Sequence, residues 1–231
     1  MEFALLGWPA DEPTLRLDYR RFSYAGKFVT GKTGIAVVRD DPDSDTDGAG
    51  DDSESDTDAE SDDSGSDDAT DDADVLSPLP EGVDADAFAD DVLAAISFSP
   101  DRTDESTLKI RYLTVRSDLR GSGRQLGPKL VAFLTRQAAG RYDRLEIAVN
   151  NVFSYHAVYK AGFGYTGRET GLAELVLERA ADKPADTGQA RYQHGLDAFR
   201  ARAGLSDAET DFLAAHGDCS PPALLAAVES S

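Results

Sequence analysis

Apolar residues along this chain gather in short runs, each about the length of a β-strand. These runs occupy residues 2–8, 34–39, 91–98, 108–115, 145–149 and 171–179. Short apolar runs between turn-forming residues predict β-strands. Residues 15–28 fit both the two-residue period of a strand and the stripe of a helix. We expect a short helix or an irregular segment there.

Two stretches with helical spacing follow the fourth and fifth runs. In the first, the apolar residues Leu126, Leu130, Phe133 and Leu134 recur at this spacing; in the second, Val152, Tyr155, His156 and Tyr159 share one face. The second stretch begins at Asn151, a good helix cap, and stops at Gly162, a good helix terminator. Both stretches therefore predict amphipathic helices, the second over about residues 151–161.

The end of the chain changes to a helical pattern. Residues 206–209 spell a capping box, residues 189–203 give a further helical candidate, and Ser220-Pro221 opens a last predicted helix through Leu224, Leu225 and Val228. Taken together, the elements predict a mixed α/β (α+β) domain over residues 1–179 and a helical extension over residues 180–231.

The formal net charge of −21 comes mostly from one segment. Residues 40–74 hold 18 of the 44 Asp and Glu and no Lys or Arg, which leaves 26 acidic against 23 basic residues elsewhere. Such a composition cannot bury enough apolar area to offset its ordering entropy, so we expect a disordered acidic insertion. The segments on either side of it have strand patterns. They favour an unusually long hairpin connection inside one domain over a linker between two domains.

The composition also excludes several classes of partner. A body with nearly balanced charge offers no broad basic surface, so we expect no nucleic acid partner. No window approaches the ~20 apolar residues that cross a bilayer, and the amino terminus lacks a basic leader, so we expect no membrane partner and a cytoplasmic protein. The single cysteine, Cys219, cannot form an internal disulfide. The preference for Asp over Glu and Arg over Lys fits a halophilic archaeon or a GC-rich genome.

The turn at residues 120–123 is the first candidate for chemistry. Gly121 and Gly123 lack a Cβ, so the backbone can adopt positive φ and approach a ligand closely. The turn opens a helix, whose amino end attracts anions, and Arg120 and Arg124 add positive charge. The pattern therefore predicts a phosphate site, although a glycine pair before a helix is often only a tight turn.

Two titratable residues are candidates for proton transfer. Tyr159 could protonate a leaving thiolate, since a phenol with a pKa near ~10 can act as an acid; the alternative is a core tyrosine packed against Phe163. Glu146 is a candidate general base, or a solvent-facing residue, and a chain of water molecules is an equal alternative. We expect no metal, because His156, His194 and His216 lack ligand spacing.

At this point the chain resembles the Gcn5-related N-acetyltransferase (GNAT) superfamily. The resemblance rests on residues 113–116, 120–123, 145–150 and 157–163 in this order, and it covers roughly residues 92–179. It implies a mixed sheet in which two neighbouring parallel strands splay apart to admit acetyl-coenzyme A, and direct acetyl transfer to an amine. By this resemblance the cofactor-binding residues are Leu113, Val115, Arg120, Gly121, Ser122, Gly123, Arg124, Gln125, Gly127 and Asn151, and Tyr159 protonates the departing thiolate.

One position departs from the family pattern. The family turn usually has Gly or Ala two residues after the position of Gly123, and this chain has Gln125 there. A turn lengthened by two residues, with Gly127 and Pro128 starting the helix, would restore a small residue at the crowded point. In a turn of ordinary length, the Gln125 side chain would obstruct the phosphates.

The expected partners are acetyl-coenzyme A and an amine acceptor on a small molecule or a protein, and the resemblance allows a homodimer. A catalytically inactive module that binds acyl-coenzyme A or a protein is the alternative function. Recruitment of basic proteins by residues 40–74 is a weaker idea than a solvated, salt-adapted insertion. This fold sets acceptor specificity in the segments 9–33 and 166–171. Neither segment shows a residue pattern that identifies the acceptor.

Overall fold

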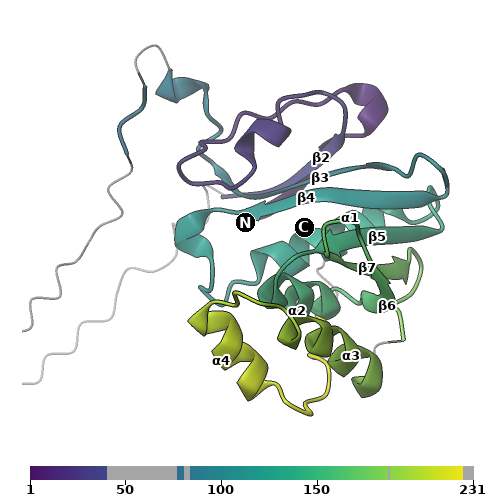
Figure 1. Ribbon diagram of the computed structural model, residues 1–231. Helices are drawn as coiled ribbons and strands as arrows, with labels where there is room; N and C mark the ends of the chain where they lie inside the picture. Colours follow the sequence, from purple (N-terminus) through teal and green to yellow (C-terminus); the bar gives the residue numbers. More distant parts are fainter. Residues whose placement is uncertain (41–76, 81–83, 187, 226–231) are drawn as a thin grey trace, which may run out of the picture.

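The computed structural model describes residues 1–40, 77–80, 84–186 and 188–225. Its centre is a seven-stranded mixed sheet with the strand order β1-β2-β3-β4-β5-β7-β6 (Figure 1). Nearly all of the predicted acidic insertion lies outside the described residues. The strands are β1 (Glu2–Gly7), β2 (Gly34–Arg39), β3 (Val92–Pro100), β4 (Thr107–Val115), β5 (Arg144–Val149), β6 (Gly164–Glu169) and β7 (Leu175–Ala180).

The two faces of the sheet are covered by different parts of the chain. Helices α1 (Leu126–Ala138) and α2 (Val152–Lys160) pack on one face and form the main core with β3, β4 and β5. Residues 15–28 cover part of the other face, where Leu17, Phe22 and Phe28 pack against β2 and β3. This segment contains only one short 3-10 turn, Ala25–Lys27, so the irregular alternative for it is confirmed.

Antiparallel pairing of β2 with β3 explains why a long insertion is tolerated between them. The two strands are neighbours from the pair Gly34 and Phe98 to the pair Arg39 and Val92. The connection from residue 40 to residue 91 therefore joins adjacent strands of one sheet, and the entropic cost of closing it rises only slowly with its length. The predicted hairpin pairing of the two flanking strands is confirmed.

The predicted caps of the helices are present. The side chain of Asn151 accepts a hydrogen bond from the Ser154 amide at 2.8 Å and so begins α2. Helices α3 (Gln189–Arg200) and α4 (Asp207–Ala215) follow, and the capping box of Ser206 and Glu209 opens α4.

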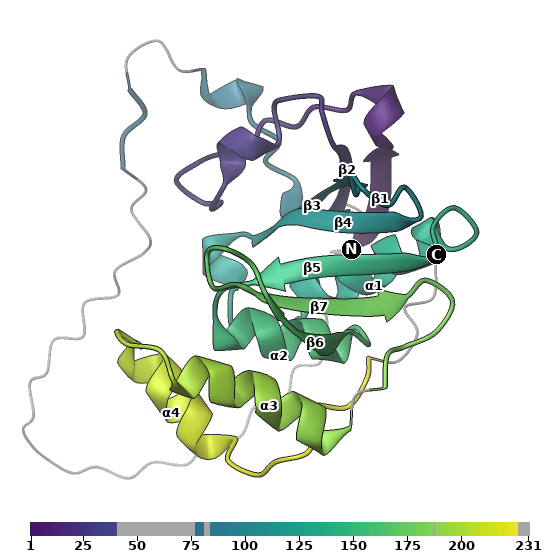
Figure 2. The ribbon, with the colours of Figure 1, turned by 45° about the vertical axis from the view of Figure 1, so that its right-hand side comes forward.

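The helical extension shares the core of the sheet domain. Its buried residues Tyr192, Phe199 and Leu213 belong to the same apolar cluster as α1 and α2. Just beyond α3, Arg202 donates hydrogen bonds to the carbonyls of Asn150, at 2.8 Å, and Ala173. The extension therefore packs beneath α2 and is tied to the carboxyl end of β5 (Figure 2).

Two elements differ from the sequence-based expectation. The predicted strand over residues 171–179 begins only at Leu175, because residues 170–173 form a turn in which Leu172 is exposed. Its partner β6 was not predicted, since an edge strand with only Gly164 and Tyr165 buried has no apolar alternation.

The last predicted helix is wrong over its described part. Residues 220–225 have no helical structure, and Val228 lies outside the described residues. Pro221 and Pro222 supply no amide hydrogens, and a segment this short gains too little from cooperativity to offset helix nucleation. Instead the chain runs back to α2, where the Leu225 amide donates to the Lys160 carbonyl at 2.8 Å.

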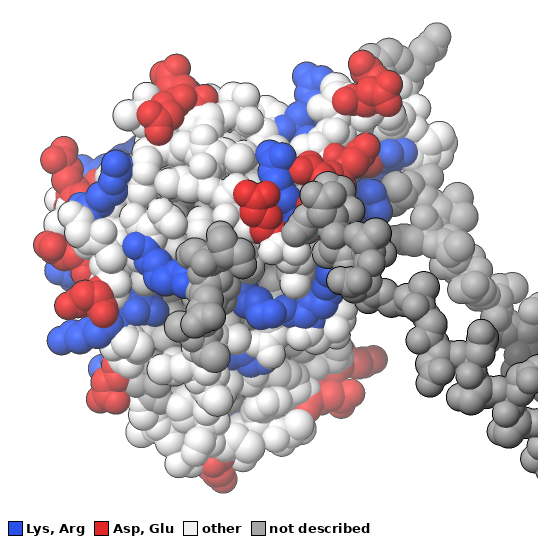
Figure 3. All heavy atoms as spheres, turned by 180° about the vertical axis from the view of Figure 1, so that it is seen from behind, with Lys and Arg blue, Asp and Glu red and all other residues white. Residues whose placement is uncertain are grey.

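The surface of the described body carries both signs of charge. Basic and acidic side chains are interspersed on the face seen in Figure 3, as the near balance of charge outside residues 40–74 requires. In the part of the chain that the structure describes, none of the helices has the length and apolar character needed to cross a membrane.

Candidate functional site

The central feature of the site is a pair of parallel strands that part. The ladder between β4 and β5 runs from the pair Thr107 and Arg144 to the pair Ile110 and Ile147, and stops there. Strand β4 continues to Val115, still paired with β3. Strand β5 continues to Val149, paired with β7. The carboxyl ends of two neighbouring strands are therefore free of each other, as Figure 2 shows for β4 and β5.

A β-bulge accounts for the parting. Between β3 and β4, Ser97 pairs with Tyr112 but Phe98 pairs with Ile110, so Arg111 is an extra residue in β4. A bulge bends the strand and increases its twist. It lies one residue beyond the last pair between β4 and β5, so the bend turns β4 away from β5 at this point.

The turn after β4 presents amides without protein partners. Gly121 and Gly123 have φ of 74° and 76°, and a Cβ at either position would meet nothing within 4 Å. Across the described residues, the amides of Gly121, Gly123, Arg124 and Gln125 have no hydrogen-bond acceptor. Successive free amides at the start of a helix form a concave site for an anion.

Helix α1 begins late enough for the longer turn. Gln125 has φ 55° and ψ 37° and precedes the helix, which starts at Leu126. Gly127 and Pro128 therefore lie in the first helical turn, as the longer-turn alternative expects. A Cβ on Gly127 would lie 3.6 Å from Val115 and 3.7 Å from Leu113, so this small residue brings the helix close to β4.

The two arginines of the turn differ in whether other protein groups already bind their guanidinium groups. Arg120 donates to the Val115 carbonyl at 3.1 Å and to the Ser23 hydroxyl at 2.8 Å. Arg124 forms no ion pair with any residue that the structure describes, so its charge is available to a ligand. Arg120 thus fixes the turn to the amino-terminal segment, and Arg124 adds charge.

Tyr159 lies in a buried aromatic cluster. Its side chain has 0% exposure. Its hydroxyl accepts a hydrogen bond from the Tyr165 amide at 3.0 Å and lies 3.2 Å from the Tyr155 hydroxyl. Burial raises the pKa of Tyr159, although hydrogen bonds from Tyr155 and Tyr165 oppose the shift. Its proposed proton transfer stays a prediction, and the contacts are those of a packed core residue.

Glu146 forms ion pairs on the sheet face opposite α1. Its carboxylate lies 3.0 Å from Lys109 and 2.8 Å from Arg168. Burial alone would raise the pKa of Glu146, but the hydrogen bonds from Arg168 and Lys109 outweigh it and hold the pKa below its usual value. A carboxylate with a lowered pKa is a weak base, so its role as general base stays a prediction that this geometry does not favour.

The other predicted cofactor contacts lie around the parted strands. Leu113 and Val115 belong to the free end of β4 and pack toward the α1 side. Ser122 donates from its hydroxyl to the Leu119 carbonyl at 2.8 Å and shapes the turn. Asn151 stands at the end of β5, with its side-chain oxygen engaged as the cap of α2. The structure brings these residues together at the carboxyl ends of the central strands β4 and β5.

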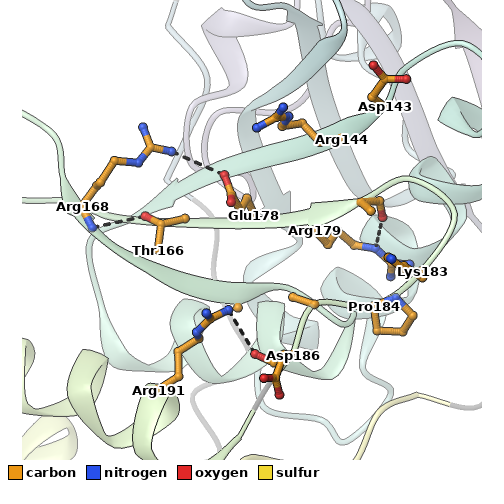
Figure 4. A pocket seen from close by; sticks show the side chains of 13 residues that line it. Asp143, Arg144, Thr166, Arg168, Glu178, Arg179, Lys183, Pro184, Asp186 and Arg191 are labelled. Carbon is orange, nitrogen blue, oxygen red and sulfur yellow. Dashed lines mark hydrogen bonds and ion pairs between the residues drawn. The ribbon is translucent and has the colours of Figure 1, made fainter.

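A separate depression lies near the amino end of β5 and the carboxyl end of β7. It has a volume of about 550 Å³ and lies among basic side chains of β5, β6, β7 and α3 (Figure 4). Arg144, Arg168 and Arg191 contribute to its lining, together with Glu178, which is 3.6 Å from Arg168. None of the predicted site residues lines it, so this depression is not part of the candidate site.

Sequence reasoning missed the bulge, but the chain does carry its signal. Leu108 and Ile110 follow the two-residue period of a strand, and Leu113 and Val115 follow it again after a step of three. All four residues face the same core. An odd step between positions of one face requires an extra residue in the strand, which is Arg111.

Comparisons with known proteins find similarity to solved structures alone. No family model and no curated protein matches the chain. A nourseothricin acetyltransferase structure is similar at 22% identity, with a TM-score of 0.34 over 42% of this chain and 61% of that chain. An N-acetyltransferase from Staphylococcus aureus Mu50 is similar at 19% identity, with a TM-score of 0.35 over 39% of this chain and 61% of that chain.

A third similar structure is an aminoglycoside 6'-N-acetyltransferase complexed with coenzyme A. It has 16% identity and a TM-score of 0.35 over 43% of this chain and 73% of that chain. The chain spans about three fifths of the length of the first two structures. The mixed α/β fold expected from the sequence is confirmed by the strand order and by the parting of β4 from β5.

Proposed function

We propose that this chain is an N-acetyltransferase of the GNAT superfamily that uses acetyl-coenzyme A. The observation that carries the proposal is the end of the β4–β5 ladder at Ile110 and Ile147, next to the free amides that follow β4. Parallel strands have their carboxyl ends at the same edge, so the gap and the anion site adjoin. A thioester with a diphosphate at the other end of its arm requires both features together.

The residues present fit this ligand. Beyond Ile110, β4 has no β5 partner, and this stretch, with Leu113 and Val115, would run beside the amide-bearing pantetheine arm. The free amides of Gly121, Gly123, Arg124 and Gln125 and the charge of Arg124 suit the diphosphate. Gly121 and Gly123 leave the approach open because neither carries a Cβ.

The reaction follows from the nature of the thioester. An acceptor amine attacks the acetyl carbonyl carbon, a C–N bond forms, and the C–S bond breaks. Coenzyme A leaves as a thiolate, and the proton of the amine passes to water. Neither a metal nor an enzyme nucleophile is required for direct transfer, and holding the two reactants together supplies much of the acceleration.

Calorimetry with coenzyme A tests the proposed diphosphate site at the free amides before α1. In Gly123→Glu, a carboxylate repels the diphosphate at the free amides, and we expect the Kd to rise by at least about tenfold, or about 1.4 kcal/mol. The matched control is Gly140→Glu, because Gly140 also has a positive φ, 79°, and open space around its Cβ, but lies after α1. Both changes carry the same backbone strain and charge. Equal affinity of the two variants for coenzyme A would refute this diphosphate site.

A second candidate function is binding of acyl-coenzyme A without transfer. It is favoured by the paired carboxylate of Glu146 and the buried phenol of Tyr159, which leave neither group exposed beside the gap. Release of the free thiol from acetyl-coenzyme A, measured with a panel of amines, peptides and aminoglycosides, separates the two functions. Tight binding without amine-dependent release would favour the second.

A further inference from the structure

Two tyrosines from distant parts of the chain meet beside the parted strands. Tyr112 follows the bulge at Arg111 and lies on the stretch of β4 that no longer pairs with β5. It packs on the face of the sheet opposite α1, with the amino-terminal segment. The ring of Tyr24 lies 5.5 Å from the ring of Tyr112 at an angle of 39°.

The segment that carries Tyr24 is attached to the proposed cofactor turn. The carbonyl of Arg21 accepts a hydrogen bond from the Ser117 amide at 2.9 Å. The Ser23 hydroxyl accepts one from Arg120 at 2.8 Å. Figure 2 shows this segment beside the carboxyl end of β4. These two hydrogen bonds hold the segment that carries Tyr24 against residues 117–120, immediately before the loop that would bind the diphosphate.

A cation already occupies this aromatic surface. The ammonium of Lys27 lies over the ring of Tyr112, 5.6 Å from its centroid. Tyr24 precedes and Lys27 ends one 3-10 turn, in which positions three apart lie one above the other. Buried Ala25 and Phe28 anchor this turn in the core, while the ring of Tyr24 stays 54% exposed.

We propose that Tyr24 and Tyr112 form the acceptor subsite and recognise a cationic amine through their ring faces. The inference rests on the proposed function for the position of the thioester. Ring quadrupoles attract ammonium groups within about 6 Å of the centroid, and two rings bind a cation better than one. Lys27 holds the place of the acceptor in the free protein, and the acceptor amine displaces it before losing its proton and attacking the thioester.

The test uses tetramethylammonium as the probe, because it binds aromatic faces and cannot be acetylated. The full chain is titrated at constant ionic strength, with sodium as the reference ion, and the shifts of tyrosine ring signals are followed by NMR. Sodium carries the same charge, so it accounts for non-specific attraction to the acidic residues. We expect tetramethylammonium, and not sodium, to shift the ring signals of Tyr24 and Tyr112.

Five variants decide the outcome. Lys27→Ala should tighten probe binding by about threefold, the size of an exposed cation–π contact, while Lys32→Ala should not. Tyr112→Leu should abolish the response, and Tyr112→Phe should retain it because the ring face remains. Tyr19→Leu, which removes another exposed tyrosine of the same segment, controls for general effects on folding.

The subsite and the proposed function fail in different ways. Unchanged probe affinity in Lys27→Ala and Tyr112→Leu would overturn the subsite, whatever coenzyme A does. Loss of coenzyme A binding in wild-type protein with the tetramethylammonium response intact would overturn the proposed function and leave a cation site. Retained response in Tyr112→Leu that disappears in Tyr19→Leu would move the site elsewhere and so also overturn the subsite.

Discussion

At the scale of single residues, burial changes what a side chain can do. Tyr159 shares one helical face with Tyr155, and both rings pack against Tyr192 of α3. The Tyr159 hydroxyl satisfies the buried amide of Tyr165, so removing it leaves that amide without a partner. A residue in this position contributes to stability, whereas a proton donor must reach the leaving group.

Tyr159→Phe separates these two roles. We expect the free energy of unfolding to fall by about 2 kcal/mol, because a buried donor is left unsatisfied, while kcat stays within about threefold. Urea denaturation and thiol release measure the two quantities. Tyr165→Phe is the matched control, since it removes a ring hydroxyl but keeps the amide. A loss of kcat beyond about tenfold with stability unchanged would support Tyr159 as the acid.

At the scale of elements, one extra residue decides whether β4 and β5 separate. Arg111 bends β4 just where its ladder with β5 ends. Removing Arg111 would leave Ile110 on the core face and Tyr112 on the other face, because the bulge residue is the one outside the alternation. The strand could then pair with β5 along its whole length.

Deletion of Arg111 tests this account. We expect the variant to fold and to lose coenzyme A binding by at least about tenfold in calorimetry, because the gap closes. Deletion of Leu6 is the control, since Leu6 is the extra residue of a bulge in the edge strand β1, away from the gap. If the Arg111 deletion binds coenzyme A as well as wild type does, the bulge is not what opens the sheet.

At the scale of the whole molecule, the helical extension is docked through a histidine cluster. His156 of α2 lies 2.8 Å from the Tyr192 hydroxyl and packs edge-on against Phe212 of α4 and against His216, which follows α4. Burial, with smaller contributions from the charges of Lys160 and His216, lowers the pKa of His156 to about 4. The folded protein therefore holds His156 neutral, while the unfolded chain accepts a proton near its ordinary pKa of about 6.5.

The sign of the pH dependence follows from this difference. The unfolded state binds more protons between pH 6.5 and pH 4, so stability falls as the pH drops through this window. We expect a loss of about 2 kcal/mol in wild type, since partial exposure of the ring screens part of the penalty. His156→Gln should remove this loss in urea denaturation at pH 7, 5 and 4, and the control His194→Gln should retain it. Parallel curves for wild type and His156→Gln would contradict the assignment.

Much of the fold could be predicted from local pattern alone. Strands β1 to β5, the helices α1 to α4 and the caps at Asn151 and Ser206 follow from periodicity and capping chemistry within a few residues. Strand β6 could not be predicted, because an edge strand is defined by its neighbour β7 and not by its own apolar residues.

In the candidate site too, some features follow from the local sequence and others depend on the tertiary structure. The sequence by itself determined the glycine turn before α1, because positive φ and open space depend on the residue type at Gly121 and Gly123. Only the tertiary structure decided that Tyr159 is buried, that Glu146 is paired and that Tyr24 meets Tyr112. Turn geometry is set by adjacent residues, whereas burial, ion pairing and ring contacts depend on segments far apart in the chain, which only folding brings together.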